Sequence, residues 1–262
     1  MSKLTSVRRK ELLAHIQREG HCTISGLADR FGVSVATIHR DVNELVERNR
    51  CRKVHGGVET IPDSVGESAW NSSFAVRIDR NRDKKRAIAR RAAAFVDDED
   101  VVFLDSSTTA FYLARELCMR GPGRLTLVTN SGCIASEFHR FSEQVTLISI
   151  GGVYNAMLNS FLGGMAREAV RSLRIGKVFL SAVGITLEGL FTFHEQHAAF
   201  LGELIEGSAE SFALIDSTKF GRDAVFRICG LKDVGAVVTD SGLDAPARLA
   251  YGEAGCRFLA SS

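Results

Sequence analysis

This sequence of 262 residues has six scattered cysteines and no C-x-x-C pair, and this spacing excludes a small disulfide framework. We expect reduced thiols, several of them in the core. No apolar run reaches 18 residues, so we expect no membrane-spanning helix. The first residues are polar and basic and lack the apolar segment of a signal peptide. These absences predict a cytoplasmic protein without membrane contact. The six cysteines stand at positions 22, 51, 118, 133, 229 and 256.

A large net charge is also absent, since 33 lysines and arginines stand against 31 aspartates and glutamates. The charges are nevertheless uneven along the chain. Residues 1–57 hold 11 basic and 6 acidic residues, a balance of +5, and the remainder holds 22 and 25, a balance of −3. A basic head on a mildly acidic body favours a phosphate-contacting module joined to a regulatory module. The length also suits two domains.

The stretch from Ser34 to Leu45 has the pattern of a helix that binds DNA. Ser34 is placed to cap the helix, and apolar residues follow the i, i+4, i+7, i+8 spacing of one buried face. Short hydroxyl and cationic groups lie on the other face near the helix start, where a recognition helix meets bases and phosphates. A surface helix with a solvated polar face is the alternative. The residues assigned to DNA here are Ser34, Thr37, His39, Arg40 and Asn43.

The neighbouring segments favour the DNA-binding interpretation. Residues 7–19 and 24–31 predict two helices, and a glycine turn leads from the second into Ser34, which is the helix-turn-helix order. Residues 50–58 predict two short strands around a glycine turn, and this wing offers Lys53 and His55 to the DNA backbone. We therefore predict a winged helix-turn-helix domain over residues 1–58.

The remaining chain predicts an open α/β domain over residues 74–262, joined to the head by a polar, turn-forming linker at 59–73. Residues 74–95 predict one long helix. Its basic cluster at 80–86 is interpreted as a solvated face or a salt-bridged hinge, with DNA contact as the alternative. Apolar runs between helical stretches predict a mainly parallel sheet covered on both faces. The strands are expected at 101–104, 125–128, 145–150, 178–182, 212–215 and 236–239.

Small polar residues follow these strands, at the edge where such sheets bind ligands. The strand ends include 105–109, 129–131, 151–152, 184–186 and 216–219. Hydroxyls and amides at helix starts suit an anion such as phosphate, Lys219 adds a positive charge, and Asp105 suits sugar hydroxyls. The residues assigned to an effector are Asp105, Ser106, Ser107, Thr108, Thr109, Thr129, Asn130, Ser131, Gly151, Gly152, Glu195 and Lys219.

The run V-S-V-A-T-I-H-R-D-V at 33–42, followed by R-K-V-H-G-G at 52–57, resembles the winged helix-turn-helix of DeoR-type bacterial transcriptional regulators. The polar residues at 105–109, 129–131, 151–152 and 216–220 resemble the effector domain of the same family. The resemblance implies a sensor fold shared with ribose-5-phosphate isomerase that binds phosphorylated sugars or their metabolites. Three positions depart from the family pattern and leave operator and effector open: His39 for arginine, Ser107 for glycine and Leu201 for lysine.

Two other functions are alternatives. A sugar-phosphate isomerase would use Asp105, Glu195 and Lys219 for proton transfer. A metal-responsive regulator would bind its ion through His194 and His197. We favour a non-enzymatic regulator without cofactor or metal, a repressor of a carbohydrate-metabolism operon. Its expected partners are double-stranded operator DNA, a small phosphorylated sugar-type effector and copies of itself in a dimer or tetramer.

Overall fold

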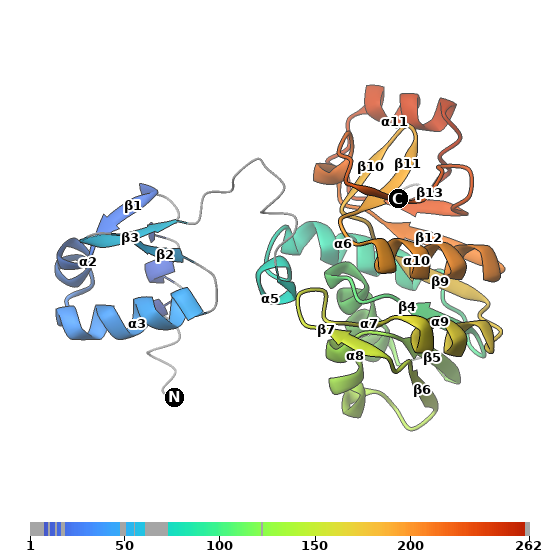
Figure 1. Ribbon diagram of the computed structural model, residues 1–262, viewed down its shortest axis with the longest axis horizontal. Helices are drawn as coiled ribbons and strands as arrows, with labels where there is room; N and C mark the ends of the chain where they lie inside the picture. The colour runs from blue at the N-terminus through green and yellow to red at the C-terminus, as the bar shows by residue number, and fades with distance from the viewer. Residues whose placement is uncertain are drawn as a thin grey trace. The chain divides into compact units, whose positions relative to one another are not determined.

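The computed structural model describes residues 8–9, 11–13, 15–16, 19–47, 51–54, 56–60, 73–121 and 123–259 (Figure 1). The chain divides into two compact units, a head (Met1–Val76) and a body (Arg77–Ser262). Most of the predicted linker, at 61–72, lies outside the described residues. In the described ranges, no helix combines the length and the apolar character that crossing a bilayer demands.

Two helices of the head meet at a tight turn. Helix α2 (Ile24–Phe31) ends at Gly32, whose φ of 61° is the left-handed conformation that glycine adopts without strain. Helix α3 (Val35–Glu47) follows Ser34, whose Oγ accepts a hydrogen bond of 3.2 Å from the Thr37 amide. The predicted cap and helix are therefore confirmed.

Three short strands complete the head in the antiparallel order β1-β3-β2. Strands β2 (Cys51–Val54) and β3 (Gly57–Thr60) confirm the predicted wing. Strand β1 (His21–Thr23) was not predicted, because three residues are too few to show an alternating pattern. A small apolar core joins sheet and helices, and includes Leu12, Ile16, Leu27, Ile38, Val42 and Val58.

The body is built on a seven-stranded sheet in which every described strand pair is parallel, as predicted. Its strands carry continuous apolar runs because both faces are covered. Their order is β15 (Phe258–Leu259), β14 (Ala236–Val238), β12 (Glu210–Leu214), β9 (Lys177–Leu180), β4 (Val101–Leu104), β5 (Leu125–Thr129) and β6 (Val145–Ser149).

The order in which the chain adds strands to the sheet reverses beside β4. From β4 the chain runs outward through α7 (Thr108–Arg120) and α8 (Gly132–Ser136), and then returns to β9 on the other side of β4. Right-handed crossovers in opposite directions place α7 and α8 on one face and α10 (Glu195–Gly207) on the other. The carboxyl ends of β4 and β9 therefore form the switch point, where open α/β sheets bind ligands. Further helical elements of the body are α9 (Gly164–Arg171), η2 (Ser217–Lys219) and α11 (Ala245–Glu253).

The single helix predicted over 74–95 is wrong. The structure has α5 (Phe74–Arg77) and α6 (Arg82–Ala93), separated by a turn in which Asn81 adopts φ 50°. Asparagine tolerates this left-handed conformation better than most residues. Its side-chain amide donates to Asp216 Oδ1 (3.2 Å) and Thr218 Oγ1 (3.0 Å), which lie far away in the sequence and hold the turn in place.

Two small antiparallel sheets beside the main sheet were not predicted. One pairs β7 (Val153–Asn155) with β8 (Ser160–Leu162), and the other has the order β10-β11-β13. Residues 184–186, predicted as the end of a parallel strand, instead form β10 (Gly184–Thr186) of this second sheet. The other two strands are β11 (Gly189–Thr192) and β13 (Phe226–Cys229).

Candidate functional site

The polar face of α3 is available to a ligand. His39, Arg40 and Asn43 are exposed, and Thr37 is half-buried. The Ser34 hydroxyl, besides capping the helix, lies 2.9 Å from the Thr37 hydroxyl, so these two groups order the helix start. On the wing Lys53 is exposed. His55, also assigned to DNA, lies outside the described residues.

A buried aspartate on the same helix positions this face. Asp41 is only 1% exposed, and its two carboxylate oxygens accept hydrogen bonds of 2.7 Å from Arg8 Nε and Arg9 Nε. Burial alone would raise the pKa of Asp41, but the two arginines outweigh burial and lower it below the usual value. The sequence analysis missed this link, because the partners stand more than 30 residues away.

We expect Asp41→Asn to lower the free energy of unfolding of the head by about 2–3 kcal/mol, because two guanidinium groups lose their carboxylate. Since the folded pKa is depressed, the stabilisation is present above about pH 4 and is lost as the pH falls through the folded value. Urea unfolding of the full chain at pH 7 and pH 3.5 measures both effects. Asp29→Asn, at an exposed position on α2, is the matched control. Equal stability of the two variants at pH 7 would contradict the anchoring role.

At the switch point, Asp105 links the ends of β4 and β9. The residue is completely buried, and its carboxylate accepts hydrogen bonds from the amides of Ser107 (3.0 Å) and Ser181 (2.9 Å). Burial raises the pKa of Asp105, while these hydrogen bonds and the nearby Lys219 oppose the rise. Asp105 therefore braces the loop through these two hydrogen bonds. Ser106, Thr108 and Thr109 are buried beside it, and the Thr109 hydroxyl has no hydrogen-bond partner within the described residues.

The residues after β5 form the second buried polar loop. The Thr129 hydroxyl donates to Leu104 O (2.7 Å) and ties β5 to β4. Asn130 donates through its side chain to the Ser160 hydroxyl (2.8 Å), while its Oδ1 is buried without a partner among the described residues. The Ser131 hydroxyl accepts from the Ile134 amide (3.3 Å) and caps α8. Orphaned oxygens of this kind are rare in interiors and mark groups that a ligand can satisfy.

Lys219 is the partly buried cation of the switch point. Its Nζ donates to the Ser181 hydroxyl (3.0 Å) and to Ala182 O (2.6 Å). Burial lowers the pKa of Lys219, and the positive charges of Arg77 and Arg80 lower it further, against the opposing effect of the carboxylates Asp216 and Asp105. Lys219 and Asp105, both predicted from the sequence, thus lie close enough for the charge of each to affect the pKa of the other.

The basic cluster at 80–86 is in part the solvated, salt-bridged segment interpreted from the sequence, since Arg82 and Arg86 are exposed and Lys84 pairs with Asp240, but Lys85 departs from it. Lys85 is 4% exposed, and its Nζ donates to the backbone oxygens of Arg77 and Arg80. Burial and the charge of Lys219 lower the pKa of Lys85 to about 7. The α5–α6 turn therefore supplies Arg77, Arg80 and Lys85 to the same cluster as Lys219. The sequence analysis missed these residues because a charge run alone gives no sign of burial.

A second lysine fixes the loop that carries Lys219. Lys84 Nζ lies 3.0 Å from Asp240 Oδ2 and also donates to the Ser217 hydroxyl. The Ser217 amide donates to Asp240 Oδ1 (2.7 Å), and Asp216 Oδ1 accepts from the Thr218 amide (3.1 Å). Together with Asn81, these contacts hold η2 against α6.

The two predicted glycines after β6 differ. Gly152 adopts φ 145°, and a Cβ there would lie 2.6 Å from Leu162 O, so only glycine fits. Gly151 is exposed and has open space around its Cα. The backbone conformation thus requires glycine at 152, and Gly151 leaves that edge of the sheet accessible.

Three residues singled out in the sequence have other surroundings than expected. The Ser107 hydroxyl caps α7 by accepting from the Ala110 amide (3.1 Å). Leu201 is completely buried in the main core and does not face the site. Glu195 is exposed and lines another groove, with Arg167 and Glu203, so the structure does not bring it to Asp105 and Lys219.

The histidine pair is poorly placed for a metal ion. His197 is 8% exposed, and its Nδ1 lies 3.4 Å from the Thr192 hydroxyl. Within the described part of the chain, no three His, Cys, Asp or Glu side chains gather as a metal site. All six cysteines are free thiols, as expected, and only Cys118 and Cys133 are not buried.

Comparison with known proteins decides the family. Residues 8–63 match the DeoR-like helix-turn-helix domain, and residues 80–241 match the DeoR C terminal sensor domain. The chain belongs to the DeoR family. It is 32% identical to the transcriptional regulator YulB of Bacillus subtilis, over 92% of this chain and 91% of that protein. It is also 32% identical to the transcriptional repressor AccR of Agrobacterium fabrum, over 91% and 90% of the two chains.

As a DeoR-family member, the chain is a DNA-binding transcriptional regulator rather than an enzyme. The resemblance stated from the motifs is thereby confirmed, as is the fold class of a helix-turn-helix domain with a parallel α/β sensor domain. Among solved structures, the chain is similar to ribose 5-phosphate isomerase A of Methanocaldococcus jannaschii. That match has a TM-score of 0.39 and 18% identity, and it covers 53% of this chain and 55% of the other.

Proposed function

We propose that this chain is a cytoplasmic repressor that binds paired operator half-sites as a dimer or tetramer and senses a phosphorylated sugar in its body. Helix α3 contacts the bases and phosphates of the operator through the exposed Arg40, His39 and Asn43. The wing contacts the DNA backbone through Lys53 and His55. AccR, a relative, is named a transcriptional repressor, and another relative, of Lactococcus lactis, is named a lactose phosphotransferase system repressor.

One observation carries the effector proposal. Four basic groups, Arg77, Arg80, Lys85 and Lys219, act on one another near the carboxylates of Asp105 and Asp216. Like charges held together in a poorly hydrated place are costly, and an anion that enters removes the cost. A phosphate satisfies the cations, and the sugar hydroxyls suit the orphaned oxygens of Thr109 and Asn130.

The effector regulates by linkage. An anion that prefers one arrangement of the α5–α6 turn shifts the body toward that arrangement, and the turn directly follows the head in the chain. The largest possible change in DNA affinity is then the ratio of the ligand's affinities for the two arrangements.

The DNA-binding half is tested first with Arg40→Ala. DNA duplexes that the full chain selects from a random library serve as the operator. We expect Arg40→Ala to weaken binding about 10- to 100-fold and to reduce the salt slope by about one. Arg40→Lys keeps the positive charge but lacks the planar guanidinium, so it should keep the salt slope and lose discrimination between bases. If Arg40→Ala bound the selected duplex like the native chain, with the same slope, the docking would be wrong.

A further inference from the structure

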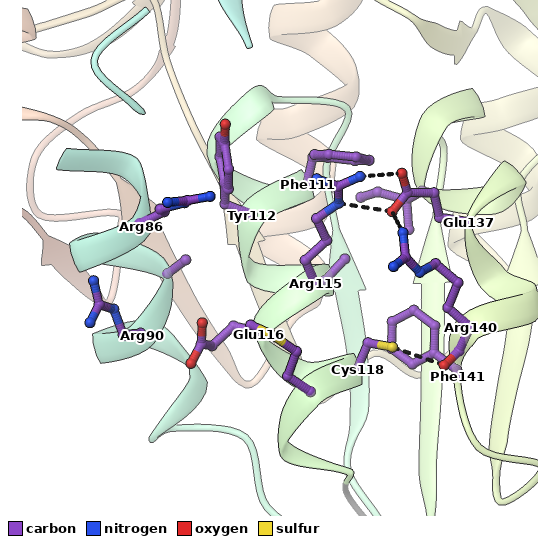
Figure 2. Close-up of a pocket in the computed structure, with 14 residues that line it drawn as sticks. Arg86, Arg90, Phe111, Tyr112, Arg115, Glu116, Cys118, Glu137, Arg140 and Phe141 are labelled. Atoms are coloured by element: carbon purple, nitrogen blue, oxygen red, sulfur yellow. Dashed lines mark hydrogen bonds and ion pairs between the residues drawn. The ribbon is translucent and has the colours of Figure 1, made fainter. Parts of the chain in front are cut away.

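A cavity lies on the outer side of the body, among residues other than those of the strand ends. It has a volume of about 540 Å³ and is formed by α6, α7 and the segment of α8 and η1 (Phe138–Arg140) (Figure 2). This size is within the range of small-molecule sites. It shares no lining residue with the cationic cluster of the switch point. We call it the α7 groove.

The floor of the α7 groove is apolar and aromatic. Phe111 and Tyr112 lie on neighbouring positions of α7 and face the two sides of the groove, and Phe141 closes one end (Figure 2). Met119 leaves 75% of its surface exposed at the rim, although it is a large apolar residue. Such a surface gains from being covered, and methionine adapts to the shape of what covers it.

Arginines surround this floor. Arg115 lies 4.6 Å above the Phe111 ring and pairs through two nitrogens with Glu137, and Arg140 shares that glutamate. Arg86 and Arg90 stand one turn apart on α6 and line the other side. Neither has a carboxylate within ion-pair distance in the part of the chain that the structure describes.

The charge of the groove is therefore not balanced from within. Its lining holds four arginines against Glu116 and Glu137, a balance of +2. Like charges at i and i+4, as in Arg86 and Arg90, destabilise a helix modestly, and a bound anion reverses that effect.

We propose that the α7 groove is a second ligand site, for an organic anion with a flat apolar body. The apolar body lies in the groove against Phe141, Met119 and the exposed edges of Phe111 and Tyr112, whose rings stand 77° apart. The anionic group binds Arg86 and Arg90 bidentately. A free sugar phosphate lacks the apolar body, and an uncharged aromatic lacks the anion. The site thus selects a chemical class different from that proposed for the switch point.

The test uses the full chain and 1-naphthyl phosphate, with 1-naphthol and inorganic phosphate as partial ligands, in titration calorimetry. We expect the naphthyl phosphate to bind at least about tenfold more tightly than either partial ligand. The double variant Arg86→Gln/Arg90→Gln should remove most of this gain, because it deletes the anion partners at two non-core positions. Arg124→Gln removes one exposed arginine elsewhere on the body and should leave binding unchanged.

The position of the ligand is read from two cysteines. Cys118 lines the α7 groove, whereas Cys133 stands on α8 directly after the strand-end loop and does not line it. Bound naphthyl phosphate should slow alkylation of Cys118 by iodoacetamide and leave Cys133 unaffected. Protection of Cys133 alone would place the ligand at the switch point and overturn the proposal. So would a double variant that weakens duplex DNA binding but not naphthyl phosphate binding, since the arginines would then serve DNA.

Discussion

A chain with methionine in place of Lys219 should bind a phosphorylated sugar about 100-fold more weakly than the native chain, or not measurably. Lys219 is partly buried at the switch point, with its Nζ held by the Ser181 hydroxyl and Ala182 O. Losing one partner of a desolvated charged hydrogen bond costs about 2–5 kcal/mol of binding free energy, which corresponds to this loss of affinity.

The measurement is the unfolding midpoint of the full chain against a panel of sugar phosphates and the matching free sugars. A ligand that binds the native state raises the midpoint with its occupancy. Lys232→Met removes an exposed lysine of the body and is the matched control, which should keep the native shift. A Lys219→Met chain that folds and still shows the full shift would place the phosphate elsewhere.

The same titration has a pH dependence that reports on Lys85. Its pKa is lowered to about 7 by burial and by Lys219, so the side chain is largely neutral at pH 8. An entering phosphate favours the protonated form, so binding above pH 7 takes up a proton and affinity falls as the pH rises from 7 to 9. Lys85→Met should remove this slope, while Lys84→Met, on the neighbouring residue that pairs with Asp240, should keep it. Affinity independent of pH in the native chain would exclude Lys85 from the site.

The parts of the fold that follow local patterns were predictable from sequence. Apolar runs such as Val101–Leu104 and Leu125–Thr129 are buried on both faces, so they show as continuous hydrophobic segments and predict parallel strands. The polar loops after them follow from the same argument, because the carboxyl ends of parallel strands share one edge. Asp105, Asn130 and Lys219 were found in this way.

The parts that depend on long-range contacts were not predictable. The turn at Asn81 is held by Asp216 and Thr218, and a helical pattern continues through it in the sequence. Lys85 stands in a charge run typical of a solvated surface, yet tertiary packing buries it. Glu195 was assigned by its position in the sequence, but its place at the start of α10 turns it to solvent. For Asn81 and Lys85 the deciding contacts are made by residues outside the local helical pattern.

His197 should make the body sensitive to mild acid. Its imidazole is buried, its Nε2 has no hydrogen-bond partner within the described residues, and burial with the charges of Arg77 and His194 lowers its pKa to about 3. In the unfolded chain a histidine titrates near about 6.5. The stabilisation from neutral His197 is therefore complete above that pH and is lost as the pH falls toward 3, because only the unfolded chain takes up the proton.

The loss amounts to at most about 1.4 kcal/mol per pH unit, or roughly 2 kcal/mol between pH 6.5 and pH 5. Urea unfolding of the full chain, followed by circular dichroism at pH 7 and pH 5, measures it. His197→Gln should reduce the difference between the two pH values by this amount, even if it lowers stability at both, whereas His139→Gln, at an exposed position on η1, should leave the difference unchanged. A His197→Gln chain that loses as much stability at pH 5 as the native chain would show that the body accepts the charged imidazole. An ion held by His194 and His197 would need His197 to open to solvent, so the same burial that produces the acid sensitivity also weakens the metal-sensing alternative.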